Sequence, residues 1–251
     1  MQDAVHRAIE TMWNHYSEPV SLSDLADAAI LSRFYFSRVF RQVTGTSPGR
    51  FLSAIRLHQA KGLLRNSALS VTEISYQVGY NSPGTFTSRF TRSVGLSPTR
   101  YRDQARLTGV GPSPLPGPPQ LDPRRGNVVG TVNRSGVVPL RNVYVGAFGG
   151  PIPEGRPVSW DILGPGQPGF QLHGLPEGSW HIRAAGLDGS APEYSAQRRM
   201  LIGTCPVVTV QSGRDIELDI TLRPSSLFDL PVLFALPELD CRDHGLMAGA
   251  Y

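Results

Sequence analysis

The sequence has one lysine, two cysteines and no long apolar run. Lys61 stands against 23 arginines, a bias that the codon usage of a high-GC genome explains better than function does. Cys205 and Cys241 are too few for the disulfide framework of a small secreted protein. The most apolar stretch, around 227–236, is interrupted by Asp229 and Pro231 and is too short to span a bilayer. Since the N-terminus also lacks the basic and apolar regions of a signal peptide, these absences predict a cytoplasmic protein without a membrane partner.

Signatures of catalytic and metal sites are also scarce. The sequence contains no His-Glu-x-x-His or P-loop motif. His173 and His181 fall in adjoining predicted strands without a third ligand at a suitable spacing, so we expect no metal site. Cys205 is expected to be a small buried apolar residue rather than a redox sensor. We therefore predict that the chain is not an enzyme and needs no cofactor.

Glycine and proline divide the chain. Residues 109–119 hold eight of them, in a run that favours extended polyproline-type conformations, so we predict a linker over 107–125. Before it, residues 1–106 carry 13 basic and 7 acidic residues, a net charge of +6. After it, residues 107–251 carry 11 and 13, a net charge of −2. This imbalance indicates a polyanion partner for the first part only.

Residues 1–106 have a helical periodicity. Apolar residues at three- and four-residue spacing indicate a first amphipathic helix: Val5, Ile9, Met12, Trp13 and Tyr16. Ser21 lies three residues before Asp24, a spacing typical of a capping box at the start of a second helix. The complete set of further helices is predicted over 22–29, 33–43, 48–64, 71–78 and 83–94.

The helical part repeats itself at an offset of 50 residues. Seven positions are identical in the two copies: Ser32 and Ser82, Phe36 and Phe86, Phe40 and Phe90, Gly45 and Gly95, Ser47 and Ser97, Pro48 and Pro98, Arg50 and Arg100. Each copy has a short helix, a tight turn and a second helix with two phenylalanines four residues apart. The repeat therefore predicts two helix-turn-helix units joined by the helix 48–64.

The second copy carries a more specific pattern. Residues 71–80 (VTEISYQVGY) and 95–102 (GLSPTRYR), with Phe86 and Phe90 between them, resemble the second unit of the AraC/XylS family of bacterial regulators. The match covers about residues 1–105. The resemblance implies a transcriptional regulator, commonly an activator, that places two recognition helices into successive major-groove segments of one DNA face. The joining helix would hold them about 34 Å apart, one turn of the duplex.

The first recognition helix is predicted to be the main reader of sequence. We expect its outward side chains to contact DNA: Arg33, Phe34, Ser37, Arg38 and Arg41. Arginine suits bidentate contact with guanine, and a phenylalanine can pack against a thymine methyl group. A merely solvated arginine face is the alternative, which an exposed phenylalanine disfavours. The inward stripe is expected to consist of Phe36, Val39, Phe40 and Val43.

The second recognition helix is predicted to contribute less. Its outward positions are Pro83, Gly84, Thr87, Ser88 and Thr91, with Arg92 behind them. The family often has arginine at the position of Ser88, whereas here Arg89 follows one residue later, rotated by about 100°. We expect Arg89 to reach a phosphate or to pair with a carboxylate. Further phosphate candidates are the helix N-terminal amides near Ser32 and Ser82, and Arg100 and Arg102, two arginines that are alternatively plain surface charge.

The turn of the first copy departs from that of the second. Ile30 occupies the position of Gly79, where a left-handed backbone favours glycine. A β-branched residue in that conformation is strained. We therefore expect the first turn to be built differently from the second.

The pattern after the linker is one of short strands. Six β-branched or aromatic runs separated by turns predict a small β-sandwich: 128–132, 143–148, 170–172, 180–184, 207–210 and 216–222. The segments 130–132, 139–145 and 169–184 resemble the transthyretin-like fold of carboxypeptidase regulatory domains, over 126–223. That resemblance implies a scaffold of about seven strands and no reaction. Trp160 and Tyr194, in loop-like surroundings, are the candidate ligand-binding residues.

The chain is thus predicted to be a multidomain protein, with an all-α double helix-turn-helix domain over 1–106 and an all-β domain over 126–223. An apolar tail over 224–251 either packs back on the protein or makes a dimer contact. We expect a regulator that a small ligand controls through the β-domain; the alternative is an interaction or dimerisation module without a ligand. The candidate partners are double-stranded promoter or operator DNA, RNA polymerase, a second copy of the chain and an effector that the sequence does not identify.

Overall fold

The computed structural model describes residues 1–107, 125–134, 140–188 and 200–236, and the chain forms two compact units. The helical unit consists of Met1–Gly109, Pro151–Gly155 and Ser226–Ala235. The sheet unit consists of Val110–Gly150, Arg156–Ser225 and Leu236–Tyr251. The helical unit is therefore larger than the predicted domain over 1–106, because two segments from the second half of the chain belong to it. Tyr194, most of the predicted linker and the tail beyond residue 236 lie outside the described residues.

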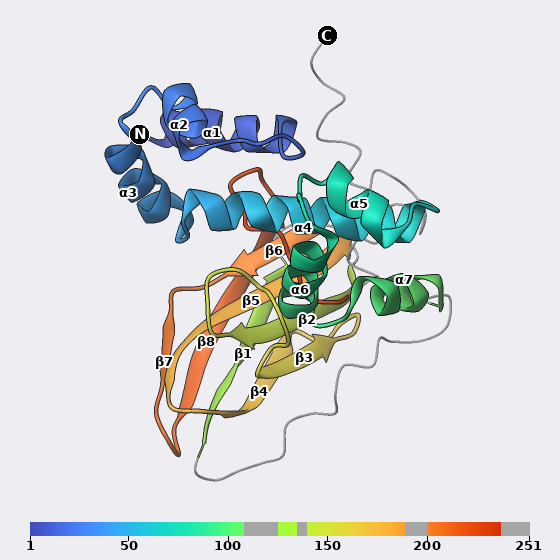
Figure 1. The fold of residues 1–251 in the computed structure, drawn as a ribbon. Coiled ribbons are helices and arrows are strands. Elements are labelled where there is room, and N and C mark those ends of the chain that lie inside the picture. The colour runs from blue at the N-terminus through green and yellow to red at the C-terminus, as the bar shows by residue number, and fades with distance from the viewer. Residues whose placement is uncertain (108–124, 135–139, 189–199, 237–251) are drawn as a thin grey trace. The chain divides into compact units, whose positions relative to one another are not determined.

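Helices make up most of the helical unit (Figure 1). In the described part of the chain they are α1 (Gln2–Asn14), α2 (Leu22–Ala28), α3 (Arg33–Thr44), α4 (Pro48–Asn66), α5 (Val71–Gln77), α6 (Pro83–Val94) and α7 (Pro98–Leu107). The first six lie where the periodicity predicted them, and α7 is an addition. The two helix-turn-helix units are α2–α3 and α5–α6, with the long helix α4 running between them (Figure 1).

Local sequence determines where these helices begin and end. The Ser21 side chain accepts a hydrogen bond from the Asp24 amide while the Asp24 carboxylate accepts one from the Ser21 amide, so the predicted capping box is present. Ser70 and Glu73 form the same box at the start of α5. These hydrogen bonds lower the pKa of both carboxyl groups. Both recognition helices end at a glycine with a left-handed backbone, Gly45 (φ 75°) and Gly95 (φ 85°).

Aromatic pairs form the core of each helix-turn-helix unit. In the first, the ring of Phe40 lies 5.4 Å from that of Phe36 and 5.5 Å from that of Phe51 of α4. In the second, Phe90 lies 5.6 Å from Phe86. Each buried phenylalanine contributes about 1.5–3 kcal/mol by leaving water. Val43 was predicted to complete the inward stripe but is 38% exposed, because the last turn of α3 extends past the packed face.

Residues 226–235 supply part of the apolar core of the helical unit. Their side chains join the clusters around both helix-turn-helix units: Leu227, Phe228 and Leu230 in the first, and Leu230, Leu233 and Ala235 in the second. Lys61 of α4, the chain's one lysine, is 1% exposed. Its ammonium donates to the carbonyls of Val232 and Phe234, at 3.1 and 3.2 Å. These residues of the predicted tail therefore pack against the protein's own helices.

The strands of the sheet unit form one hydrogen-bonded sheet. They are β1 (Gly126–Arg134), β2 (Leu140–Phe148), β3 (Ser159–Leu163), β4 (Gly169–Leu175), β5 (Gly178–Asp188), β6 (Met200–Thr204), β7 (Val208–Val210) and β8 (Asp215–Pro224). Their order is β3-β2-β5-β6-β8-β1-β4, and β7 pairs with β5 (Figure 1). The prediction of a sandwich differs from this arrangement, since β6 and β8 pair and join what would be two sheets.

The pair β1–β8 is parallel and closely packed. Gly130 faces Leu218 in its register, and a Cβ atom at Gly130 would overlap the Leu218 carbonyl. The glycine at the start of the segment 130–132 is thus required by the close approach of two strands. Buried side chains of these strands pack together as the apolar core of this unit, which includes Val128, Phe170 and Ile182.

Candidate nucleic-acid interface

The outward face of α3 carries a cluster of cationic and aromatic side chains. Arg33, Arg38 and Arg41 are exposed, as expected, and Ser37 is half-buried beside them. Phe34 is 87% exposed, so this helix presents a large apolar ring to solvent. The guanidinium of Arg38 lies over the ring of Tyr35, 5.1 Å from its centroid, which orients the arginine along the helix surface. All five predicted contact residues of this helix therefore lie on one accessible face.

The outward face of α6 has less charge. Gly84, Ser88, Arg89 and Arg92 are exposed, whereas Pro83 and Thr87 are half-buried. Arg89 has no ion pair within the described ranges, so the predicted carboxylate partner is not found. Its charge instead lies near that of Arg56 of α4, where it adds to the effect of burial in lowering the pKa of Arg56. An arginine beside a second cation is suited to a phosphate.

The turns of both helix-turn-helix units have the same backbone. Ile30 has φ 57° and Gly79 has φ 84°. In each unit the amide after this residue donates to the carbonyl five residues earlier: Leu31 to Ala26 and Tyr80 to Ser75, both at 2.9 Å. The expectation that the first turn is built differently is therefore wrong. The geometry is retained because the Ile30 side chain is 79% exposed and meets no steric obstacle, although its backbone is strained.

Among the described residues, arginines of the helical unit bind backbone carbonyls. Arg7 donates to Ala28 and Ala29 at the end of α2, and Arg56 donates to Tyr16 and Glu18 after α1. Arg102, a predicted phosphate candidate, donates to the carbonyls of Leu64 and Leu69. Its guanidinium thus connects α7 to the end of α4, whereas Arg100 is exposed. No sequence signal separates these structural arginines from the others, because their partners are backbone atoms.

Two further features bear on binding a polyanion. Between residues 28 and 102 the chain has eleven basic residues and one acidic residue, Glu73. The N-terminus of α3 carries no side-chain cap from Ser32 in the described structure, so its first amides remain available, whereas the Ser82 hydroxyl accepts from the Thr85 amide at the start of α6. Charge and uncapped amides are therefore concentrated at the first recognition helix.

The residues 45–49 (GTSPG) match the Gly-x-Ser-x-Gly pattern of hydrolase nucleophiles. In those enzymes the serine lies on a turn from a strand to a helix. Here the five residues join the helices α3 and α4, and the Ser47 hydroxyl accepts a hydrogen bond from the Arg50 amide as the N-cap of α4. The match is therefore a helix cap.

The candidate ligand residues of the sheet unit are dispersed. Trp160 lies in β3, opposite Gly146 of β2, and not in the loop that was predicted. His173 contacts Gln171, and His181 contacts Arg183, where burial and that charge lower the pKa of His181. Burial raises the pKa of the Cys205 thiol, which packs against the apolar core.

Among the residues that the structure describes, no group of three or more His, Cys, Asp or Glu side chains is placed to hold a metal ion. None of the described helices is long and apolar enough to cross a membrane.

Comparison with known proteins shows relatives for the helical unit. A family model described as a helix-turn-helix domain matches residues 25–104. An uncharacterized HTH-type transcriptional regulator of Haemophilus influenzae is 43% identical over 86 residues, 34% of this chain and 29% of that protein. The HTH-type transcriptional activator RhaS of an Enterobacter species is 37% identical over 89 residues, 36% of this chain and 32% of that protein. The chain thus spans about a third of the length of these curated relatives.

A solved structure is similar to the same region. The DNA-binding domain of AdpA, described as a global transcriptional factor in complex with a target DNA, is 34% identical. The likeness covers 41% of this chain and 94% of that one, with a TM-score of 0.40.

Proposed function

We propose that this chain, whose residues 25–104 match a helix-turn-helix domain, is a sequence-specific DNA-binding regulator of transcription of the AraC type. The observation that carries the proposal is the face of α3, where an exposed Phe34 lies among three exposed arginines. An aromatic ring on a helix face that only contacts water gains no stabilisation. In a major groove the ring can contact thymine methyl groups, and the arginines can bind guanine edges.

The length of α4 supports simultaneous use of both units. Its 19 residues span about 28 Å at 1.5 Å per residue, close to the 34 Å of one duplex turn. In this arrangement α3 reads bases with Phe34, Arg38 and neighbouring side chains. The helix α6 makes fewer base contacts and places Arg89 and Arg92 near phosphates. Arg100 and the N-terminal amides of α3 add contacts to the DNA backbone.

We propose further that the sheet unit receives the signal, as a sensory or interaction module. The segments over 126–223 that resemble the transthyretin-like fold are typical of a scaffold without a reaction. A small ligand near Trp160 is one form of this proposal. A second copy of the chain, or RNA polymerase, is the other.

Salt-dependent binding tests the central proposal. Affinity for a duplex that the full chain selects from a randomised library should fall with a slope of about −0.9 per phosphate neutralised, on logarithmic axes. The selected duplex should bind at least about 1,000-fold more tightly than random DNA. As a control, Arg214→Ala removes an exposed arginine of the sheet unit and should leave both values unchanged. Equal affinity for selected and random DNA would disprove sequence-specific binding.

A further inference from the structure

The segment 151–155 spans the C-terminal ends of both recognition helices, although it comes from the connection between β2 and β3. At one end of this segment the Cβ of Pro151 lies 3.6 Å from the position of a Cβ at Gly45, the residue that ends α3. At the other end the Gly155 amide donates to the carbonyl of Ser93, in the last turn of α6. Ile152, between them, is buried in the core of the second unit.

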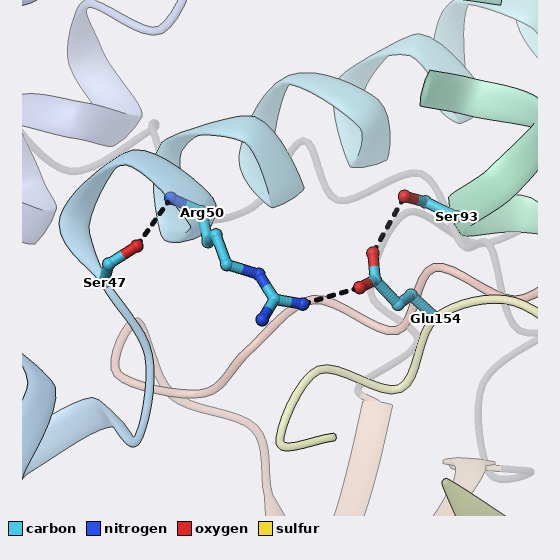
Figure 2. A network of polar contacts seen from close by, with 4 residues as sticks. All are labelled: Ser47, Arg50, Ser93 and Glu154. Atoms are coloured by element: carbon cyan, nitrogen blue, oxygen red, sulfur yellow. Dashed lines mark hydrogen bonds and ion pairs between the residues drawn. The ribbon is translucent and has the colours of Figure 1, made fainter. Parts of the chain in front are cut away.

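Within this segment the carboxylate of Glu154 bridges α4 and the second helix-turn-helix unit (Figure 2). One of its oxygens, Oε1, lies 2.7 Å from Nη2 of Arg50, in the first turn of α4 directly after the first unit. The other, Oε2, accepts a hydrogen bond of 2.8 Å from the hydroxyl of Ser93. A single side chain therefore connects the start of α4 to the end of α6 (Figure 2).

The backbone that carries Glu154 is itself held in place. The amides of Leu233 and Phe234 donate to the carbonyl of Pro153, and the Ala235 amide donates to Val94 at the end of α6. Residues 233–235 thus tie the 151–155 segment to the end of α6 within the helical unit. A carboxylate on a fixed backbone can hold two other groups at a fixed separation, which a side chain on a freely moving loop cannot do.

We infer that Glu154 is a positioning residue for DNA recognition, which holds the two recognition helices at the separation and angle that one DNA face requires. The inference rests on the proposed DNA binding. The ion pair is partly exposed, and such pairs stabilise a fold by little. Its effect is instead on geometry: two binding elements gain from being linked only when the link matches the distance between their sites.

The inference is tested by how the DNA affinity depends on the spacing of the two half-sites, the DNA segments that α3 and α6 would contact. The full chain should prefer its selected duplex to one with a single base pair inserted between the half-sites, by about tenfold. Glu154→Ala should reduce the ratio of these two affinities at least about threefold, because recognition helices held less firmly can bind both spacings. It should leave the affinity for a duplex with only the first half-site within about twofold of the wild-type value.

Two further variants separate positioning from general damage. Glu154→Gln keeps the size and a hydrogen bond to Ser93 but removes the charge, so its ratio should lie between those of the wild type and Glu154→Ala. Glu177→Ala, at an exposed glutamate between β4 and β5, is the matched control and should leave the ratio unchanged. An unchanged ratio in Glu154→Ala, with specific binding intact, would overturn the inference and leave the proposed function standing.

A measurement without DNA keeps the two proposals distinguishable. Spin labels on Gln42→Cys in α3 and Ser88→Cys in α6, with Cys205 and Cys241 replaced by serine, report the distance between the recognition helices. The distribution should be narrow in the otherwise wild-type chain and broader with Glu154→Ala. Identical distributions would overturn the inference even if DNA binding were confirmed. A broader distribution in Glu154→Ala, together with equal affinity for selected and random DNA, would show that Glu154 positions the helices. It would also disprove the sequence-specific DNA binding on which the inference rests.

Discussion

The first helix-turn-helix unit turns at Ile30 and the second at Gly79, with the same left-handed backbone and the same hydrogen-bond pattern. The surroundings of the two turns differ. A Cβ atom at Gly79 would lie 2.8 Å from the carbonyl oxygen of Tyr16 and 2.9 Å from that of Ser17, whereas the Ile30 side chain points into solvent. The second turn is thus enclosed by its neighbours, and the first is free to carry an unfavourable residue.

Charge divides the two units in the opposite sense. The recognition helix α3 has three exposed arginines and an exposed phenylalanine, while α6 has two arginines, one of which lies near Arg56. In the second unit, Lys61 of α4 also holds residues 232–234 through two carbonyls. Under the proposed function, the first unit would therefore read bases and the second would mainly anchor the protein to the DNA backbone.

The largest expected effect comes from breaking the enclosed turn. Gly79→Ala should lower the free energy of unfolding of the helical unit by about 3 kcal/mol, because it adds backbone strain and a clash with two carbonyl oxygens. Urea denaturation followed by circular dichroism measures this loss. As a control, Gly49→Ala places its Cβ where no described atom lies within 4 Å, and it should change stability by less than about 1 kcal/mol. Equal losses in both variants would contradict the steric explanation.

The next effect tests the division between reading and anchoring. Arg38→Ala should cost about 1–3 kcal/mol of binding free energy at one base pair and relax the preference there. Arg89→Ala should weaken binding about equally on all sequences and reduce the salt slope by about 1. Competition binding against single-base variants of the selected duplex measures both. If Arg89→Ala instead changed the preference at one base pair, α6 would be a reader as well.

The smallest effect concerns the exposed turn. Ile30→Gly should stabilise the helical unit by about 0.5–1 kcal/mol, since relief of left-handed strain exceeds the added entropy of the unfolded chain. Thermal unfolding of the variant against the wild type measures the gain. Ile30→Asn, which tolerates this conformation and adds less unfolded-state entropy, should also stabilise. Destabilisation by both variants would show that the isoleucine side chain makes a stabilising contact.

The repeat and its capping residues were sufficient to predict α1 to α6, but not α7 or the segments 151–155 and 226–235 of the helical unit. Paired serines, phenylalanines and glycines at an offset of 50 indicated the two helix-turn-helix units, because each residue type has a local role that sequence reveals. The strands β3 and β6 were not predicted, since each has five residues and an alternation interrupted by Asp161 or Gly203. Their pairing depends on long-range partners that no local pattern encodes.

The site was predictable only where side chains face solvent. Helical periodicity was enough to place Phe34 and the arginines of α3 outward. It could not show that Arg102 binds carbonyls of Leu64 and Leu69, or that Glu154 lies against Arg50 across 104 positions of sequence. Such contacts depend on which distant segments meet, and the apolar character of 227–236 indicated only that this segment needed a surface to cover.

Completion of the helical unit by residues 226–235 has a consequence for how the protein is made. During synthesis the helices emerge first, yet Lys61 and the apolar side chains beside it find their partners only after residue 235 has left the ribosome. If translation ends within the sheet unit, the apolar core of the helices lacks the side chains of residues 226–235. Lys61 then also lacks the carbonyls of Val232 and Phe234. Full packing of the first hundred residues is therefore a late event of folding, reserved for chains that have been translated almost to their end.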